Sequence, residues 1–402
     1  MTDDVLPRTP VGRRKIRVVY VGHVAQLSGG EIALMRLIDA LDEVDAHVIL
    51  AEQGPLVERL RASGVSVEVL AMRERTRNLR KDRVRPGRLP ITALVDTATY
   101  TFRLARRLRA IHPDLVHTNT LKAGIYGSFA ARLARVPAVW HVRDRIASDY
   151  LRRPAVLLIR TLIATMPAGV IANSQATRQT LWRTRADTRV VYSVISDPVS
   201  WHPAGQRQTP HDRFVVGMVG RIAPWKGQHV FLEAFARAFR AGAEVAVVVG
   251  GAMFGDAEAS YGEGLRELAE ALGIADRVEF RGFREDVWDE LDGMDILVHA
   301  SVTPEPFGQV VVEAMLAGVP VIASAGGGPS EIVTDGVDGL LYPAGDVDAL
   351  ADALQRLRGD AALRVRLSDA ARIRAERFSP EAAAANVMAF YRQVLQSPSR
   401  RR

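Results

Sequence analysis

Short apolar runs alternate with amphipathic stretches along most of this sequence, and no other pattern narrows the possible folds as far. In the first half, the runs that predict strands are residues 16–21, 47–51, 65–70, 115–118, 138–141 and 169–173. Stretches with apolar residues at helical spacing separate them, as at residues 31–41 and 56–63. A repeated strand, helix, strand order predicts a parallel sheet with right-handed crossovers. We therefore expect one doubly wound α/β domain over residues 1–200.

The same alternation begins again in the second half. There, the runs that predict strands are residues 214–220, 245–249, 278–281, 296–299 and 319–323, and helices are expected at residues 228–240 and 264–272. The proline-containing segment 193–209 lacks either periodicity and is interpreted as a linker. A single core usually stops growing at about 250 to 300 residues, so a chain of 402 residues is expected to form two. We predict a second Rossmann-like domain over residues 201–378.

A third region is predicted at the C-terminal end. Ser379-Pro380-Glu381 is a typical helix start, with serine at the N-cap and proline at the first helical position. The helix is expected to continue over residues 382–395 and to end in an arginine-rich tail. Residues 379–402 thus form a helix with a basic tail that could pack back on the N-terminal domain.

The charges are distributed unevenly along the chain. Residues 1–200 hold 32 Lys and Arg against 18 Asp and Glu, although the net charge of the whole chain is only +7. The segment 73–88 alone holds eight basic and two acidic residues and is interpreted as a loop. Either the N-terminal half meets an anionic partner, such as a phosphorylated acceptor or a membrane surface, or the arginines reflect the composition of a GC-rich genome. A nucleic-acid partner is not expected, because no aromatic platform is interleaved with the basic residues.

Cysteine is absent, which excludes disulfides, thiolate metal sites and cysteine nucleophiles and fits a reducing compartment. The basic run Arg13-Arg14-Lys15 is not followed by the apolar stretch of a signal peptide, and no window approaches about 18 consecutive apolar residues. We expect a cytoplasmic protein that could lie peripherally at the inner membrane face.

One loop in the second half has the features of a phosphate site. The predicted strand 296–299 runs into residues 300–308, and helical spacing resumes at residues 309–316. Free N–H groups and the dipole at a helix start favour a phosphate, and Gly308 permits a close backbone approach. Glu305 and Glu313 could both reach one ligand lying across this helix start, where carboxylates accept hydrogen bonds from sugar hydroxyls. Taken singly, Glu305 could be only a cap and Glu313 only a solvated helix residue.

The wider pattern around this loop resembles a known family. Its parts are Glu305-Pro-Phe-Gly, Glu313-Ala-Met, Gly318-Val-Pro-Val-Ile-Ala and Gly326-Gly-Gly-Pro-Ser-Glu331. Together they resemble retaining glycosyltransferase family 4, and the resemblance covers nearly the whole chain. It implies the GT-B fold, with two Rossmann-like domains facing a central cleft. It also implies metal-independent transfer of a hexosyl group from a UDP- or GDP-sugar to an acceptor hydroxyl that the sequence leaves unidentified and that could be anionic or lipid-linked.

The resemblance also implies roles for residues of the second half. Arg221 and Lys226, in the segment after the first strand of that half, would grip the donor diphosphate. A fixed pair of cations there can neutralise the charge that develops on a departing nucleoside diphosphate. Glu313 would bind the ribose, and Glu305 the donor sugar. The remaining donor contacts would come from Phe307, Gly308 and Gln309, with the base beside Arg281 and Phe283.

In the first half, Gly29 and Gly30 lie in a glycine-rich loop between a strand and a helix, where phosphate or sugar could approach closely; a plain strand-to-helix turn would look similar. His141 ends a strand, and the resemblance implies that it touches a donor-sugar hydroxyl. The catalytic candidates are thus Arg221, Lys226, Glu305 and His141. Weaker candidates for the acceptor side of the cleft are His117, Asn119, Arg143 and Asp144.

No metal site or cofactor is expected, because Asp292 and Asp295 belong to a helix end and do not form the Asp-x-Asp pair of metal-dependent transferases. Two other functions stay open at this point. A nucleotide-sugar epimerase on the same fold would share the phosphate site, and a basic nucleic-acid-binding protein is the less favoured nonenzymatic alternative.

Overall fold

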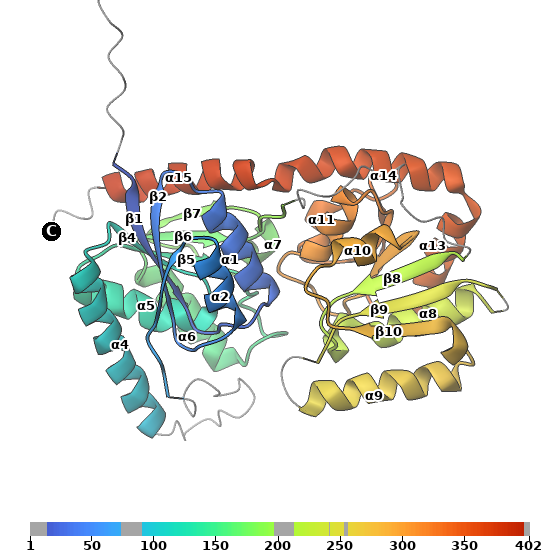
Figure 1. The fold of residues 1–402 in the computed structure, drawn as a ribbon, viewed down its shortest axis with the longest axis horizontal. Coiled ribbons are helices and arrows are strands. Elements are labelled where there is room, and N and C mark those ends of the chain that lie inside the picture. The colour runs from blue at the N-terminus through green and yellow to red at the C-terminus, as the bar shows by residue number, and fades with distance from the viewer. Residues whose placement is uncertain (1–13, 74–90, 197–212, 241, 253–255, 398–402) are drawn as a thin grey trace, which may run out of the picture.

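The computed structural model describes residues 14–73, 91–196, 213–240, 242–252 and 256–397, which form two α/β domains side by side (Figure 1). The N-terminal sheet has seven parallel strands in the order β3-β2-β1-β4-β5-β6-β7. They are β1 (Ile16–Gly22), β2 (Val44–Leu50), β3 (Ser66–Val69), β4 (Leu115–Thr118), β5 (Ala138–Val142), β6 (Gly169–Ala172) and β7 (Asp187–Val190). The order reverses between β1 and β4, and ligands of such sheets bind beyond the carboxyl ends of the strands at this point.

Helices cover both faces of this sheet. Alternate residues of β1 face opposite sides of the sheet and belong to two hydrophobic cores. Val18 and Tyr20 pack on the side of α1 (Gly29–Asp39) and α2 (Pro55–Ala62). Val19 and Val21 pack on the opposite side. The helices of that second face are α4 (Ile91–Ile111), α5 (Leu121–Ala134) and α6 (Arg153–Thr165). The short α7 (Gln175–Gln179) follows β6, and the Ser174 side chain caps it by accepting the Thr177 N–H at 2.9 Å.

The C-terminal sheet has six parallel strands in the order β10-β9-β8-β11-β12-β13. They are β8 (Val215–Val219), β9 (Val245–Val249), β10 (Val278–Gly282), β11 (Ile296–His299), β12 (Val321–Ala325) and β13 (Leu340–Pro343). Its helices are α8 (Gln228–Ala238), α9 (Asp256–Ala271), α10 (Trp288–Asp292), α11 (Gln309–Leu316), α12 (Pro329–Ile332), α13 (Val347–Gly359) and α14 (Ala361–Ala375). The two doubly wound sheets confirm the predicted fold class. The pattern missed two short edge strands: β7, which has the polar sequence DTRV, and β13, whose three apolar residues end at Pro343.

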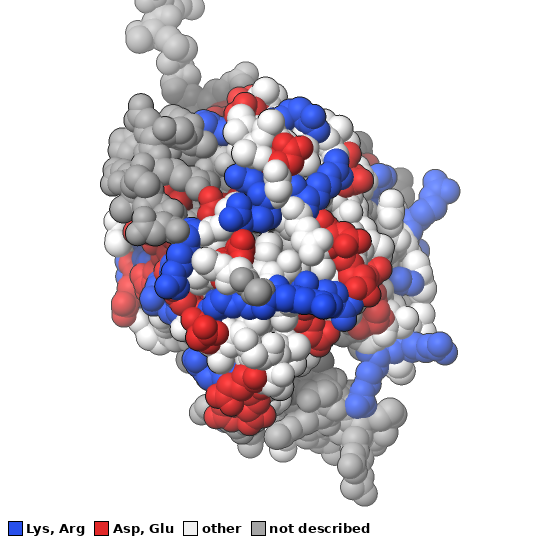
Figure 2. Space-filling model, turned by 90° about the vertical axis from the view of Figure 1, so that its right-hand side faces the viewer, with Lys and Arg blue, Asp and Glu red and all other residues white. Residues whose placement is uncertain are grey.

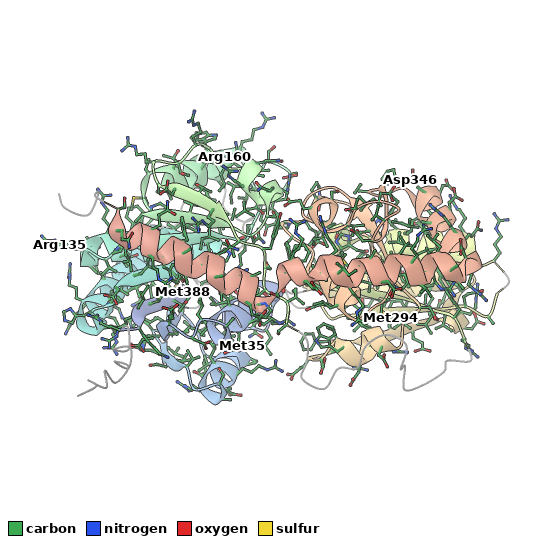
Figure 3. The ribbon with its side chains drawn as sticks, turned by 90° about the horizontal axis from the view of Figure 1, so that it is seen from above. Met35, Arg135, Arg160, Met294, Asp346 and Met388 are labelled. Atoms are coloured by element: carbon green, nitrogen blue, oxygen red, sulfur yellow. The ribbon has the colours of Figure 1, made fainter. Side chains whose placement is uncertain are left out.

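The last helix returns to the N-terminal domain. α15 (Pro380–Gln396) starts at Ser379, whose side chain accepts the Ala382 N–H at 3.3 Å. Figure 3 shows α14 running across one domain and α15 across the other. The buried face of α15, with Val387, Phe390 and Tyr391, belongs to the same core as α1 and α2. A side chain at Gly169 would meet Val394 at 2.7 Å, so this glycine lets the helix lie directly on the sheet.

The sequence also predicted a basic loop, a linker and the absence of a membrane-spanning helix. Most of the basic segment 73–88 and of the linker 193–209 falls outside the described residues. Among the helices that are described, none is both long and apolar enough to cross a membrane. The end of the C-terminal domain carries basic and acidic side chains interspersed, as Figure 2 shows, and not one large patch of a single sign.

Candidate functional site

A cleft of about 450 Å³ lies between the domains, beyond the carboxyl ends of strands from both sheets. From the N-terminal domain it is lined by the loop and first turns of α1, and by Arg59, Arg143, Asn173 and Ser193. From the C-terminal domain it is lined by the segments that follow β8, β9, β10 and β11 and by the first half of α11. Eleven predicted site residues line this cleft: Gly29, Gly30, Arg143, Arg221, Lys226, Phe283, Glu305, Phe307, Gly308, Gln309 and Glu313.

The buried carboxylate of Glu305 is the centre of a hydrogen-bond network on the C-terminal wall. Its Oε1 accepts from Lys226 Nζ at 2.6 Å, from His299 Nε2 at 3.0 Å and from the Ser301 hydroxyl. Burial would raise the pKa of Glu305, but the Lys226 ammonium and His299 outweigh burial and hold this pKa well below its usual range. Glu305 is therefore an ionised hydrogen-bond acceptor and a weak base.

Glycines bring the backbone of this wall close together. Gly227, directly after Lys226, has a φ of 78°, and a Cβ there would lie 2.0 Å from the Ala300 carbonyl oxygen. Gly327 has a φ of 67°, and its Cβ would lie 2.2 Å from the Glu305 carbonyl oxygen. The glycine run from Gly326 thus packs on the loop that holds Glu305, which explains why both motifs occur together.

The two predicted cations share one aromatic neighbour. The Arg221 guanidinium lies 5.3 Å and Lys226 Nζ 4.7 Å from the centre of the Trp225 ring. Arg221 Nε also lies 3.4 Å from a Glu258 carboxylate oxygen. Both cations line the same cleft as the start of α11, whose helix dipole also favours an anion there.

The start of α11 contacts the glycine loop of the other domain. Gln309 Nε2 donates to the Gly29 carbonyl at 2.7 Å, and a Cβ at Gly29 would lie 2.8 Å from that nitrogen. One turn further, Glu313 Oε1 lies 3.0 Å from Arg36 Nη1 of α1, and both side chains are largely buried. Sequence reasoning missed Arg36, since a lone arginine in an amphipathic helix carries no local signal. Glu313 is thus an ion-pair partner across the cleft and not a solvated helix residue.

A second contact between the domains uses the end of the glycine motif. The Glu331 carboxylate accepts the N–H of Gln175 at 2.9 Å and that of Ala176 at 2.5 Å, so it caps α7 from the neighbouring domain. The Tyr192 hydroxyl donates to Glu331 at 3.2 Å. Such a cap satisfies backbone donors that a helix start leaves unpaired, and here it also joins the two domains.

On the N-terminal wall, Arg143 is the buried cation. Its Nε donates to Asn119 Oδ1 at 2.7 Å and its Nη1 to Ser193 Oγ at 3.2 Å, while Asn119 Nδ2 donates to the Gly30 carbonyl at 3.0 Å. Burial lowers the pKa of Arg143 to about 10, although nearby Glu31 opposes the shift. The guanidinium is therefore still charged at neutral pH and is held rigidly at the cleft.

Two buried histidines lie behind Arg143. His117 Nε2 lies 3.2 Å from His141 Nδ1, and the Tyr391 hydroxyl of α15 lies 2.7 Å from His117 Nδ1. Arg143 Nη2 lies 3.4 Å from the same His141 Nδ1. Burial lowers the pKa of His117 to about 3 and that of His141 well below its usual value, so both rings are neutral. Within the described residues, His141 Nε2 is buried without a hydrogen-bond partner.

Five predicted site residues do not line the cleft. His117, His141 and Asn119 lie behind the wall, where Asn119 and His141 contact Arg143. Asp144 accepts the Tyr150 hydroxyl at 2.7 Å. Arg281 is engaged by the carboxylates of Glu279 and Glu290 on β10 and α10, whereas its neighbour Phe283 does line the cleft.

Glu31 was not predicted, although its spacing from Ser28 at the start of α1 is that of a capping box. Its carboxylate accepts from the Ser28 hydroxyl. Burial raises the pKa of Glu31 to about 7, while Ser28 and Arg143 oppose the shift.

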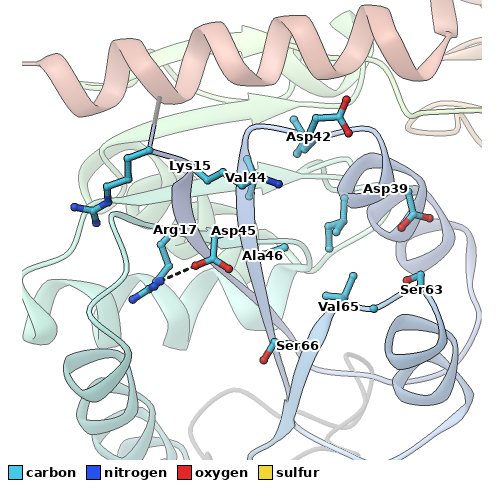
Figure 4. A pocket seen from close by; sticks show the side chains of 14 residues that line it. Lys15, Arg17, Asp39, Asp42, Val44, Asp45, Ala46, Ser63, Val65 and Ser66 are labelled. Carbon is cyan, nitrogen blue, oxygen red and sulfur yellow. Dashed lines mark hydrogen bonds and ion pairs between the residues drawn. The ribbon is translucent and has the colours of Figure 1, made fainter. Parts of the chain in front are cut away.

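Another cavity, of about 620 Å³, lies at the opposite edge of the N-terminal sheet (Figure 4). It is lined by the amino ends of β1 and β2 and includes the ion pair of Arg17 Nε with Asp45 Oδ2, 2.8 Å apart. No predicted site residue lines it. The candidate site is therefore the cleft between the domains.

Comparisons with known proteins identify the family of the chain. Residues 204–374 match the family glycosyl transferases group 1, and residues 51–194 match the glycosyl transferase 4-like domain. The chain is 32% identical over 268 residues to the lipopolysaccharide core biosynthesis glycosyltransferase LpsD of Rhizobium meliloti, which covers 66% of this chain and 71% of LpsD. It is 32% identical over 314 residues to the D-inositol 3-phosphate glycosyltransferase of Streptomyces avermitilis, covering 72% of this chain and 67% of that protein.

Among solved structures, HepE of Anabaena in complex with UDP-glucose is similar over 94% of this chain and 100% of that chain. The TM-score is 0.81 and the sequence identity 27%. The two parallel sheets, the cleft with its glycine loops and these matches lead to one conclusion: the chain belongs to the glycosyl transferases group 1 and is a glycosyltransferase of the GT-B fold.

Proposed function

We propose that this glycosyltransferase moves a hexosyl group from a UDP- or GDP-sugar to an acceptor hydroxyl, with retention of the anomeric configuration and without a metal ion. The observation that carries the proposal is the Lys226–Glu305 pair at the start of α11, with Arg221 beside it. The UDP-glucose complex of HepE, which has the same fold, supports a UDP-sugar as the first donor to test.

In this proposal the diphosphate lies across the start of α11. The free N–H groups of that helix, Lys226 and Arg221 neutralise the charge that develops as the nucleoside diphosphate departs. Glu313 binds the ribose hydroxyls, for which it exchanges its contact with Arg36. These fixed positive groups take the part that a divalent cation takes in other transferases.

The bond changes follow from the state of Glu305. The carboxylate already accepts from Lys226, His299 and Ser301, which leaves it a poor nucleophile, so no covalent glycosyl-enzyme is expected. Instead the bond from the anomeric carbon to the phosphate oxygen breaks, and the acceptor oxygen bonds to that carbon on the same face. The acceptor proton passes to an oxygen of the leaving phosphate.

We further propose that the acceptor is anionic. Three arginines, Arg36, Arg59 and Arg143, line the N-terminal wall of the cleft, and one related enzyme is named for a phosphorylated acceptor. Arginine suits phosphate because its guanidinium binds two oxygens at once. Removal of the phosphate from an active acceptor with a phosphatase is expected to abolish transfer, and unchanged transfer would contradict this part of the proposal.

The decisive experiment uses a panel of UDP-, GDP- and ADP-sugars, scored by thermal stabilisation and slow hydrolysis, followed by proton NMR of a fresh transfer product. A bound donor stabilises the native state by mass action, so the correct nucleotide is expected to raise Tm most. The product is expected to keep the donor's anomeric configuration, and activity is expected to survive excess EDTA. An inverted anomer, or activity lost in EDTA and restored by manganese, would refute the proposed mechanism but not the family.

A further inference from the structure

One face of the N-terminal domain exposes large apolar side chains. Leu94, Val95 and Phe102 on α4 are 54%, 57% and 64% exposed and follow one stripe of that helix. Phe129 and Leu133 on α5, and Leu157 and Leu158 on α6, continue the exposure. These three adjacent helices carry seven of the thirteen exposed large apolar side chains in the described part of the chain. A concentration of this kind on a folded domain marks an interaction surface.

The same helices are strongly basic. α4, α5 and α6 together hold eight Lys or Arg and a single acidic residue, Asp96, which is buried and paired with Arg73 at 3.0 Å. Arg103, Arg106 and Arg132 are exposed beside the apolar stripe. An apolar surface bordered by cations complements an anionic lipid bilayer, where apolar side chains enter the acyl boundary and arginines meet the headgroups.

The position of this face suits an enzyme that works at a membrane. Crossover helices run back from the carboxyl edge of a parallel sheet, so α4 and α6 both begin at the edge where the cleft lies. Leu94, Val95, Leu157 and Leu158 lie in the first halves of these helices. The chain's own last helix does not cover them, because α15 packs on the opposite face of the sheet, along the top of the molecule in Figure 1.

We propose that the face formed by α4, α5 and α6, with the residues named above, docks on an anionic lipid bilayer. Docking would hold the mouth of the cleft at the headgroups, within reach of an acceptor carried by a lipid. The proposal concerns binding alone and is tested without substrates, so its outcome is independent of the proposed donor chemistry.

The test is co-sedimentation of the full chain with vesicles of phosphatidylcholine, with and without phosphatidylglycerol. Binding is expected only with the anionic lipid and is expected to weaken as salt is raised. Leu94→Glu with Val95→Glu, or Leu157→Glu with Leu158→Glu, is expected to lower the binding constant at least tenfold. Arg106→Ala is expected to lower it about fivefold.

The matched control is Val365→Glu with Ile373→Glu on α14, where the two side chains are 62% and 71% exposed, and its binding is expected to equal wild type. A Tm and a circular-dichroism spectrum equal to those of the wild type show that each variant is folded. Absence of binding to anionic vesicles, or equal loss in the α14 control, would overturn the proposal. A wild-type dimer that the α4 or α6 variants dissociate would assign the face to a second copy of the chain instead.

A row of buried side chains in contact with one another links Tyr391 of α15 to Arg143 at the cleft. A guanidinium only donates, so the approach of Arg143 requires His141 Nδ1 to be an acceptor. His117 must then donate from its Nε2 to that nitrogen, which leaves His117 Nδ1 to accept the Tyr391 hydroxyl proton. We infer that Tyr391 is a positioning residue: it sets one tautomer in both histidines and thereby the place of Arg143.

Tyr391→Phe tests this inference, with Tyr20→Phe as the control. The Tyr20 hydroxyl lies 3.4 Å from that of Tyr391, whereas the Tyr20 ring, which phenylalanine keeps, packs against His117. Nitrogen-15 NMR of the wild type is expected to show His141 protonated at Nε2, with mixed tautomers in Tyr391→Phe. If the proposed function holds, the same variant lowers kcat about tenfold with little change in donor KM, and Tyr20→Phe does not. Unchanged histidine tautomers in Tyr391→Phe would overturn the inference whatever the activity.

Discussion

Replacing Lys226 with methionine removes one of three partners of the buried Glu305 carboxylate and is expected to impair folding and turnover together. The two side chains are 16% and 7% exposed and their charged atoms lie 2.6 Å apart. Breaking a buried ion pair costs about 3–5 kcal/mol. Since His299 and Ser301 still donate to Glu305, and Lys226 is partly exposed, we expect a loss of about 2–3 kcal/mol.

This loss is measured by urea unfolding and by Tm. For a domain of this size, it corresponds to a decrease in Tm of roughly 4–12 °C. Turnover is expected to fall about 10²- to 10³-fold, because Lys226 also stabilises the departing diphosphate.

The double variant Lys226→Met with Glu305→Gln separates the two effects. Its neutral amide keeps hydrogen bonds but leaves no uncompensated charge, so most of the lost stability is expected to return. Turnover is expected to stay low. Wild-type stability in the single variant would show that the pair contributes nothing, and recovered turnover in the double variant would show that Lys226 serves only to neutralise Glu305.

Further outcomes follow from the same geometry. Glu313→Gln is expected to raise donor KM more than it lowers kcat, because a ribose contact is equal in ground and transition states. Arg36→Met, which breaks the same ion pair, is expected to leave donor KM nearly unchanged, and equal donor KM values for the two variants would refute the ribose assignment. Gly327→Ala is expected to cost about 3 kcal/mol of stability and Gly336→Ala about 1, because both have positive φ but only the first Cβ meets backbone; equal Tm values would contradict this. The depressed pKa of Glu305 contributes stability above its unfolded value of about 4.3 that is lost as pH falls through the folded value, so Glu305→Gln is expected to flatten acid unfolding below about pH 4.

Local patterns predicted much of the molecule. The strands of both sheets, apart from the edge strands β7 and β13, were predicted because a buried parallel strand needs a continuous apolar run. The loop before α11 was predicted because a helix start and a glycine are local features. Eleven of the predicted site residues line the cleft because they follow strand ends or lie in the first turns of the next helix, and the carboxyl ends of parallel strands meet at one edge.

Tertiary packing decided the partners of those residues. Arg36 and Glu313 are 277 positions apart, and Tyr391 and His117 are 274 positions apart. Neither contact has a periodicity or spacing of its own, since each depends on how two domains, or a domain and the returning α15, are set against each other. Packing also decided which strand-end side chains line the cleft. His141 lies near the end of a strand as expected, but it is buried behind the cleft wall, where Arg143 lies against its ring. Its distance from the cleft depends on the side chains packed around it, which the local sequence does not reveal.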